Sequence, residues 1–148
     1  SDVAQERLEC AIKALSSKGH NTVPIKYGDF SYDSGRLTFA KAMQSNHVPT
    51  AVICSNDTMA IGVIDEARKN FGLRIPEDLS VVGFDGVNAV SWHSYQLTTI
   101  KQPLEQMTKA AVDILLEQIE SPENPAQLRL WSGTFIEGNT VGPVRNEQ

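Results

Sequence analysis

Short polar clusters follow three apolar runs of this sequence. The runs and the clusters behind them are residues 23–27 with 28–30, residues 51–54 with 55–57, and residues 80–84 with 85–86. The clusters contain carboxylates, an amide and an aromatic ring, which accept or donate hydrogen bonds and offer a flat face for stacking. Sugar hydroxyls and nucleobases need such groups, so the sequence predicts a site for a small polar molecule if folding brings the clusters together.

The order of the elements indicates how the clusters would meet. Helical patterns separate the three runs, which predicts an α/β fold with a parallel sheet and helices on both faces. The run at residues 51–54 is continuously apolar, as expected for a strand covered on both sides. Because the carboxyl ends of parallel strands lie along one edge, and ligands bind outside that edge, we expect all three clusters there.

Four helices are expected from apolar residues spaced three and four positions apart, over residues 3–15, 31–45, 57–71 and 103–119. Ser31 is expected to cap the second helix, and either Asn56 or Asp57 the third. The remaining elements are an irregular loop over the ligand edge, a short strand, a linker and a last strand, at residues 87–95, 97–100, 121–125 and 128–136.

Catalysis has weaker support than binding. The sequence contains no nucleophile elbow, no glycine-rich phosphate loop and no His-Glu-x-x-His pair. Asp57 and Asp85 could form a carboxylate pair, but helix capping explains Asp57 equally well, whereas no helix starts directly behind Asp85. We therefore expect no enzyme, no metal and no cofactor, and interpret these carboxylates as hydrogen-bond acceptors for a ligand.

Charge and composition exclude some partners. The net charge is −5 and the basic residues are scattered, so we do not expect this chain itself to bind DNA. No apolar run approaches the roughly 18 residues of a membrane-spanning helix. Cys10 and Cys54 are expected on apolar faces as the reduced thiols of a cytoplasmic protein. The sequence enters a helical pattern without a signal segment, as though cut from a longer chain.

Three blocks of the sequence resemble the effector-binding core of the LacI/GalR family of transcriptional regulators. They lie at residues 49–62, 72–85 and 97–103, and residues 28–35 match a further block upstream. The resemblance implies one lobe of a two-lobed, periplasmic-binding-protein-like type I fold. It assigns residues 1–103 to the C-terminal lobe, 104–125 to a crossing helix and linker of the N-terminal lobe, and 126–148 to a return strand and tail.

The same resemblance implies which side chains contact the effector. Six residues match the family's ligand positions: Arg7, Phe30, Asn56, Asp57, Asp85 and Gln102. Phe30 would stack on the ligand, Arg7 would line the cleft, and the others would bind its polar groups. The sequence departs from the family at residues 9–11, at Gly86 where Asp or Asn is common, and at residues 136–140, which lack the usual arginine.

Function follows from the resemblance as an expectation. It implies the sensor of a cytoplasmic, homodimeric regulator that binds a small polar effector, such as a sugar or a purine nucleoside, and so alters operator binding. Operator DNA would be bound only by an N-terminal domain absent from this chain. The alternative is a periplasmic sugar-binding protein of a transporter, which shares the fold.

The helix after Pro103 carries an apolar stripe that, under the resemblance, fits a sheet absent from this chain. The stripe consists of Leu104, Met107, Ala111, Ile114, Leu115 and Ile119. We expect it to dock on its own lobe, to pair with a second copy, or to be largely disordered. In the simpler alternative it covers one face of this chain's own sheet.

Overall fold

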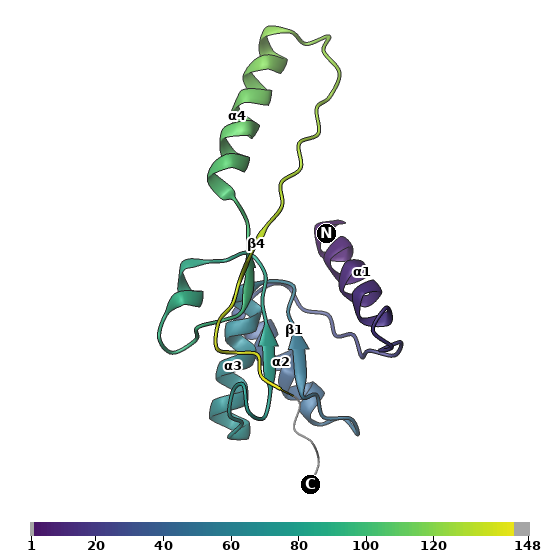
Figure 1. Cartoon of the computed structure of the whole chain (residues 1–148), viewed down its shortest axis with the longest axis vertical. Helices are drawn as coiled ribbons and strands as arrows, with labels where there is room; N and C mark the ends of the chain where they lie inside the picture. Colours follow the sequence, from purple (N-terminus) through teal and green to yellow (C-terminus); the bar gives the residue numbers. More distant parts are fainter. Residues whose placement is uncertain (1, 144–148) are drawn as a thin grey trace.

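The computed structural model describes residues 2–143, which form a lobe with a long arm (Figure 1). The elements in chain order are α1 (Asp2–Ser16), α2 (Tyr32–Met43), β1 (Ala51–Ile53), α3 (Asp57–Phe71), β2 (Ser80–Val82), the short 3-10 helix η1 (Asn88–Ser91), β3 (Thr99–Lys101), α4 (Leu104–Glu120) and β4 (Thr134–Ile136). In this part of the chain no helix is long and apolar enough to cross a membrane.

The parallel pairing predicted from the apolar runs is confirmed for two strands. β1 and β2 pair in parallel, with Val52 opposite Val81. Isolated parallel bridges, Val82 to Thr98 and Asp85 to Lys101, join the end of β2 to the chain at β3. β3 in turn pairs with β4 in antiparallel fashion. The chain that follows β2 therefore lies directly beside the chain that leads into α4.

Residues 23–27, expected as a third strand, form no regular secondary structure. The run contains Pro24, which has no N–H group to give to a ladder, and Val23, Ile25 and Tyr27 are exposed. The neighbouring edge of β1 accordingly stays open, and Ile53 is 56% exposed. The prediction of a strand here is wrong for this structure.

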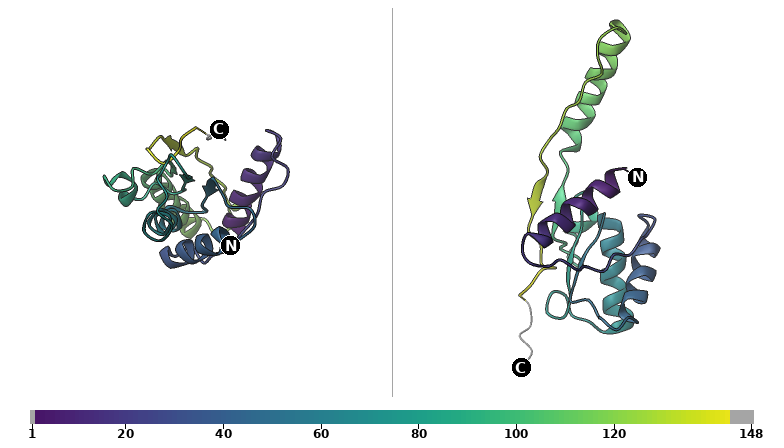
Figure 2. Two further views of the ribbon diagram at one scale, coloured as in Figure 1. Left: turned by 90° about the horizontal axis from the view of Figure 1, so that it is seen from below. Right: turned by 90° about the vertical axis from the view of Figure 1, so that its right-hand side faces the viewer.

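The core forms where α2 and α3 pack together against β2. Its buried apolar side chains are Phe39, Cys54, Ala60, Val63, Ile64, Ala67, Leu79, Val81, Val90 and Leu97. Phe39 and Phe71 add an edge-to-face contact with ring centroids 5.8 Å apart. α1 lies on the other side of β1 from these two helices (Figures 1 and 2). Cys10 on α1 is exposed, contrary to expectation, and Cys54 is buried.

Two helix caps are resolved by the structure. The Ser31 hydroxyl accepts the Ser34 N–H at 3.0 Å, which confirms the cap predicted for α2. At α3 the alternatives were Asn56 and Asp57, and the structure selects Asn56, whose Oδ1 accepts the Met59 N–H at 2.9 Å. Asp57 is the first residue of the helix itself, which leaves its carboxylate available for other partners.

The arm consists of α4 and the chain that returns beside it (Figures 1 and 2). Gln127 donates to Glu117 at 2.7 Å, and Gln118 donates to the carbonyl oxygens of Pro122 and Asn124. The last strand begins only at Thr134, later than expected, and the returning chain that precedes it runs beside α4 (Figure 1).

Most of the apolar stripe of α4 is exposed in this structure, and only Met107 and Ile114 are partly buried. Leu115 is 59% exposed and Ile119 is 65% exposed, and Leu128 and Leu130 of the returning chain are more exposed still. The helix projects away from the lobe (Figure 1). The simpler alternative, in which it covers this chain's own sheet, is therefore wrong, and so is docking on its own lobe.

Candidate ligand-binding site

The carboxyl ends of β1 and β2 lie together at one edge of the sheet. The Asp57 N–H donates to the Phe84 carbonyl at 2.8 Å, so the residues just after the two strands are tied to each other. Asn56 and Asp85 flank this bond in the sequence. Because parallel strands end side by side, the polar clusters behind β1 and β2 face the same edge, as the sequence predicted.

Two of the six predicted residues, Arg7 and Gln102, donate hydrogen bonds to one carboxylate oxygen of a third, Asp85. Asp85 Oδ1 accepts a hydrogen bond from Arg7 Nη2 at 3.0 Å and one from Gln102 Nε2 at 2.7 Å. Arg7 comes from α1, Asp85 follows β2, and Gln102 precedes α4, so three separate parts of the chain build the cluster. No described residue bonds Asp85 Oδ2, and the side chains of Arg7 and Asp85 are half-buried. One carboxylate oxygen therefore remains free to accept a bond from a ligand.

Two further contacts hold the Arg7 guanidinium in place. Its Nη1 donates to the Ser55 carbonyl at 2.7 Å, and its central carbon lies 4.0 Å from the centroid of the Phe84 ring. The planar guanidinium is thus stacked on an aromatic face and bonded along its edge, a geometry that lysine cannot reproduce. Neither Ser55 nor Phe84 was selected from the sequence, because backbone acceptors and stacking partners leave no residue-type signal.

Asn56 and Phe30 form a second group at the same edge. Asn56 Nδ2 donates to the Phe30 carbonyl at 3.0 Å, so one side chain both caps α3 and fixes the loop before α2. Phe30 has φ 68°, an unusual conformation for a residue with a side chain, and is 37% exposed. Hydrogen bonds from Ser31 to the neighbouring Asp29 carboxylate lower the pKa of Asp29 to about 2. The loop is therefore braced, and its aromatic side chain remains accessible.

Asp57 is placed differently from the prediction. Its residue is 0% exposed, so solvent does not reach the side chain. Oδ1 accepts the Thr99 hydroxyl at 2.6 Å, and Oδ2 accepts the N–H groups of Gly86 at 2.6 Å and Val87 at 2.9 Å. Burial raises the pKa of Asp57, while these hydrogen bonds oppose the shift. Asp57 therefore does not cap α3, and its buried, fully bonded carboxylate favours a structural role over the ligand contact that the resemblance implies.

The cavities of the lobe do not by themselves identify the site. A crevice of about 210 Å³ between α1 and the loop at residues 25–30 includes Phe30, Ser55 and Met59 in its lining. A larger cavity of about 260 Å³ lies elsewhere and includes none of the six predicted residues. The convergence of charged and amide groups on Asp85 is the stronger indication of a ligand site, since a polar ligand needs oriented hydrogen bonds.

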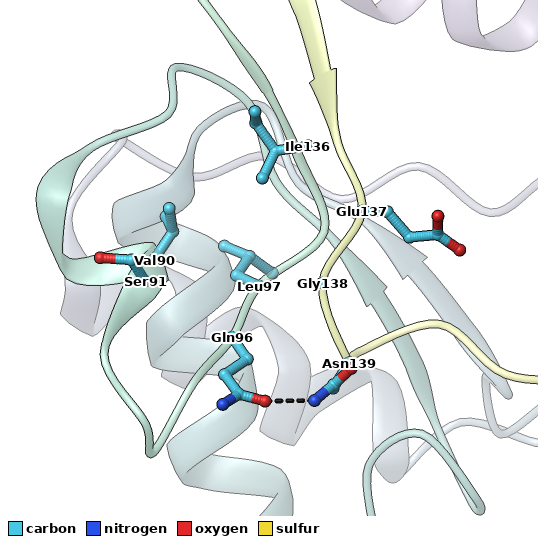
Figure 3. Close-up of a pocket in the computed structure, with 8 residues that line it drawn as sticks. All are labelled: Val90, Ser91, Gln96, Leu97, Ile136, Glu137, Gly138 and Asn139. Carbon is cyan, nitrogen blue, oxygen red and sulfur yellow. Dashed lines mark hydrogen bonds between the residues drawn. The ribbon is translucent and has the colours of Figure 1, made fainter.

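Figure 3 shows the larger cavity. Its apolar side is formed by Val90, Leu97 and Ile136, the side chain of Asn139 bonds that of Gln96, and Glu137 points away. No charged side chain is directed into it in this view. In the described part of the chain there is also no group of three or more His, Cys, Asp or Glu side chains that could hold a metal ion.

Known proteins share this fold and the sequence blocks described above. Residues 1–141 match a family model described as a periplasmic binding protein-like domain. The chain is 38% identical to the HTH-type transcriptional repressor PurR of Vibrio cholerae (strain M66-2) over 117 residues, which are 79% of this chain and 34% of that protein. It is 35% identical to the repressor CytR of Escherichia coli K12 over 132 residues, which are 88% of this chain and 38% of that protein.

Solved structures give the same result. A dimeric Lac repressor with a C-terminal deletion superposes with a TM-score of 0.86 and 30% identity, covering 95% of this chain and 51% of that chain. A LacI family regulator from Enterococcus faecium with bound ribose gives a TM-score of 0.85 and 26% identity, covering 96% and 53%. This chain thus spans 34–38% of the length of these two repressors and 51–53% of these two solved chains.

The four relatives are named as repressors or regulators, not as enzymes. The family model covers nearly the whole chain. The sequence blocks at residues 49–62 and 72–85 contain β1 and β2 and the polar residues that form the ligand edge. The chain belongs to the periplasmic binding protein-like domain family, and the relatives that it resembles are LacI-type regulators and repressors.

Proposed function

We propose that this chain is the C-terminal lobe of the effector sensor of a LacI-type regulator, and that it binds a small, neutral, polar effector. The observation that carries the proposal is the Asp85 carboxylate, which is oriented by Arg7 and Gln102 through Oδ1 while Oδ2 stays available. A ligand hydroxyl or N–H group would donate to Oδ2. Because Arg7 already balances the charge of Asp85, the cluster suits a neutral ligand better than an ionic one.

Five of the six predicted residues enter the proposal as ligand contacts. Asp85, Arg7 and Gln102 would bind polar groups, Phe30 would stack on the ligand, and Asn56 would use the amide hydrogen not bonded to Phe30. Asp57 is left out because its carboxylate is buried and fully bonded. A sugar or a purine nucleoside offers the hydroxyl and N–H groups that this set requires.

The exposed arm is the basis for our proposed division of the chain into domains. Residues 1–103 would form the C-terminal lobe, 104–125 would belong to the N-terminal lobe, and 126–148 would return, with residues 144–148 outside the described part. The exposed apolar stripe on α4 supports this division, because a face of that size needs a cover. This chain spans about half of the solved relatives, so the other half of each is long enough to contain the second lobe that we propose.

Regulation would follow from binding between the two lobes. An effector shifts an equilibrium only by its unequal affinity for two states, so we propose that it favours one arrangement of the lobes and thereby one operator-binding state of a homodimer. DNA contact would come from an upstream domain. We propose a cytoplasmic, non-enzymatic protein, and the names of the relatives support this over a periplasmic sugar-binding protein of a transporter.

The test uses the full-length gene product and the variant Asp85→Ala. Titration calorimetry with a panel of sugars and purine nucleosides should find a ligand whose affinity falls about tenfold or more in the variant, since losing a bond to a charged group costs roughly 1.5–3 kcal/mol. Operator binding without effector should be unchanged. Glu77→Ala, an exposed carboxylate on the loop before β2, is the control. Equal affinities in Asp85→Ala and parent would overturn the proposal.

A further inference from the structure

Asp57 is the buried group that the ligand set leaves unexplained. Its Oδ2 accepts two consecutive backbone N–H groups, those of Gly86 and Val87, directly behind Asp85. Its Oδ1 accepts the hydroxyl of Thr99 on β3. We propose that Asp57 is a positioning residue, which sets the turn carrying Asp85 so that the Asp85 carboxylate faces the effector. This inference rests on the proposed function.

The turn needs such support because its backbone conformation is unfavourable. Asp85 has φ 115°, outside the range that residues with a side chain normally adopt, and Gly86 has φ 74°. Strain of this kind persists only where surrounding contacts over-determine it. A carboxylate that accepts two successive N–H groups supplies strong, charge-assisted hydrogen bonds to the two residues that directly follow the strained Asp85. Without it, the turn is free to relax and to carry Asp85 away from the edge.

The Asp57 carboxylate also links the turn that carries Asp85 to β3. Thr99 lies on β3 three residues before Gln102, whose amide bonds Asp85 Oδ1. The backbone makes parallel connections, since the Asp85 N–H donates to the Ile100 carbonyl at 3.0 Å and the Gln102 N–H donates to the Asp85 carbonyl at 3.2 Å. Asp57 therefore joins the β2 turn to the strand that delivers Gln102, and one change there should disturb both ligand contacts.

The packing around Asp57 leaves no spare room on the β2 side. Gly83 lies beside the carboxylate, and a Cβ atom at that position would be 2.3 Å from Asp57 Oδ1. A methyl group at residue 83 would therefore crowd the carboxylate, and also the Leu97 side chain, whose Cδ2 would lie 2.9 Å away, while it alters none of the residues proposed to contact the ligand. The close approach gives a second way to test the role of Asp57 while leaving its chemistry intact.

The primary test is a double-mutant cycle on the full-length protein. Asp57→Ala should weaken effector affinity about fivefold or more, yet add little in an Asp85→Ala background, because its effect passes through Asp85. Asp57→Asn should recover most of the loss: its amide oxygen can accept the two N–H groups and its NH₂ group can donate to the Thr99 oxygen. A purely structural role would lower stability in Asp57→Ala while leaving the effector affinity of the folded protein unchanged.

The outcomes separate this inference from the proposed function. If Asp85→Ala has no effect on any effector, the proposed function fails. If Asp85→Ala weakens binding and Asp57→Ala either does not, or adds its full effect in the double variant, only the positioning role fails. Hydrogen exchange of residues 84–90 without effector gives a further readout, with faster exchange expected at Gly86 and Val87 in Asp57→Ala. Should that variant not fold, Thr99→Val and Gly83→Ala carry the same expectations, and unchanged exchange together with unchanged affinity in both would overturn the inference.

Discussion

The guanidinium of Arg7 lies 3.0 Å from Asp85 Oδ1, although the two residues are 78 positions apart in the sequence. The contact joins α1 to the end of β2 and places a cation directly beside the candidate ligand acceptor. Arg7 also stacks on Phe84 and bonds the Ser55 carbonyl. One side chain thus both ties α1 to the ligand edge and contributes the positive charge beside Asp85.

Replacing Arg7 with lysine tests whether geometry or charge matters at this position. A lysine keeps the charge but loses the planar stacking and the second hydrogen bond, so Arg7→Lys in the full-length protein should weaken effector affinity about three- to tenfold. Titration calorimetry measures the effect. The matched control is Arg74→Lys, which alters an exposed pair with Asp78. Full affinity in Arg7→Lys would show that charge alone suffices.

Phe30 is predicted to act through its ring face. The residue is partly exposed and lies outside the core, so Phe30→Ala should cost little stability but reduce effector affinity, by about fivefold or more if the ring stacks on the ligand. Phe30→Tyr keeps the ring and should bind nearly as well as the parent. Urea unfolding and calorimetry on the same samples separate the two effects. Equal losses in Phe30→Ala and Phe30→Tyr would argue against stacking.

The pKa shift of Asp57 predicts a pH dependence of stability. Burial raises the pKa of this carboxyl in the folded state above its unfolded value, so the folded protein holds the proton more tightly. Its contribution to stability is present below the unfolded pKa and is lost as pH rises through the folded pKa. The nearby Asp85 carboxylate acts in the same direction. Burial, and to a lesser extent the charge of Asp57, raise the pKa of Cys54 to about 12, so this thiol stays neutral in this range.

The measurement compares the parent with Asp57→Asn in urea unfolding from pH 4 to pH 7. The parent should lose stability relative to Asp57→Asn as pH rises, because only the parent must ionise a buried group. Asp29 gives the opposite sign, since its lowered pKa means that its contribution is lost only as pH falls toward about 2. A difference between the two proteins that stays constant with pH would contradict the shift assigned to Asp57.

Local sequence signals predicted much of this structure. The cap at Ser31, the helix over Asp57–Phe71 and the parallel pairing of β1 with β2 depend on neighbouring residues or on continuous apolar runs, and all are present. The common edge of Asn56 and Asp85 followed from the strand order. The cap and the helix are decided within a few residues, and the strand pairing follows from the alternation of strands and helices along the chain, so a single sequence suffices to find them.

Other features depend on partners distant in the sequence. From residue type alone, Asp57 could be a helix cap or a ligand contact. In the structure its Oδ1 instead accepts the hydroxyl of Thr99, 42 positions away. Residues 23–27 have the apolar content of a strand, yet they include Pro24, form no regular structure and leave the edge of β1 unpaired. Stacking of Arg7 on Phe84 likewise requires the fold to be known. For Asp57 and Arg7 the decisive contact is set by packing and not by the local pattern.

The arm gives the last prediction, which contrasts this chain with the full-length protein. Burying a Leu or Ile side chain is worth about 1.5–3 kcal/mol, so the exposed stripe on α4 should drive the isolated chain to associate. Size-exclusion chromatography with light scattering should show species larger than a monomer, and Leu115→Glu should reduce them. Gln106→Glu adds the same charge at an exposed polar position of the helix and is the control.

In the full-length protein the same substitution should act in the opposite way. If the N-terminal lobe covers the stripe, Leu115 is buried there, and a glutamate would destabilise the folded protein by several kcal/mol because it buries an unpaired charge. Gln106→Glu should change the stability far less. Urea unfolding of both full-length variants measures the difference. A full-length protein indifferent to Leu115→Glu, together with a strictly monomeric isolated chain, would show that nothing covers α4 and would remove the basis for assigning residues 104–125 to another lobe.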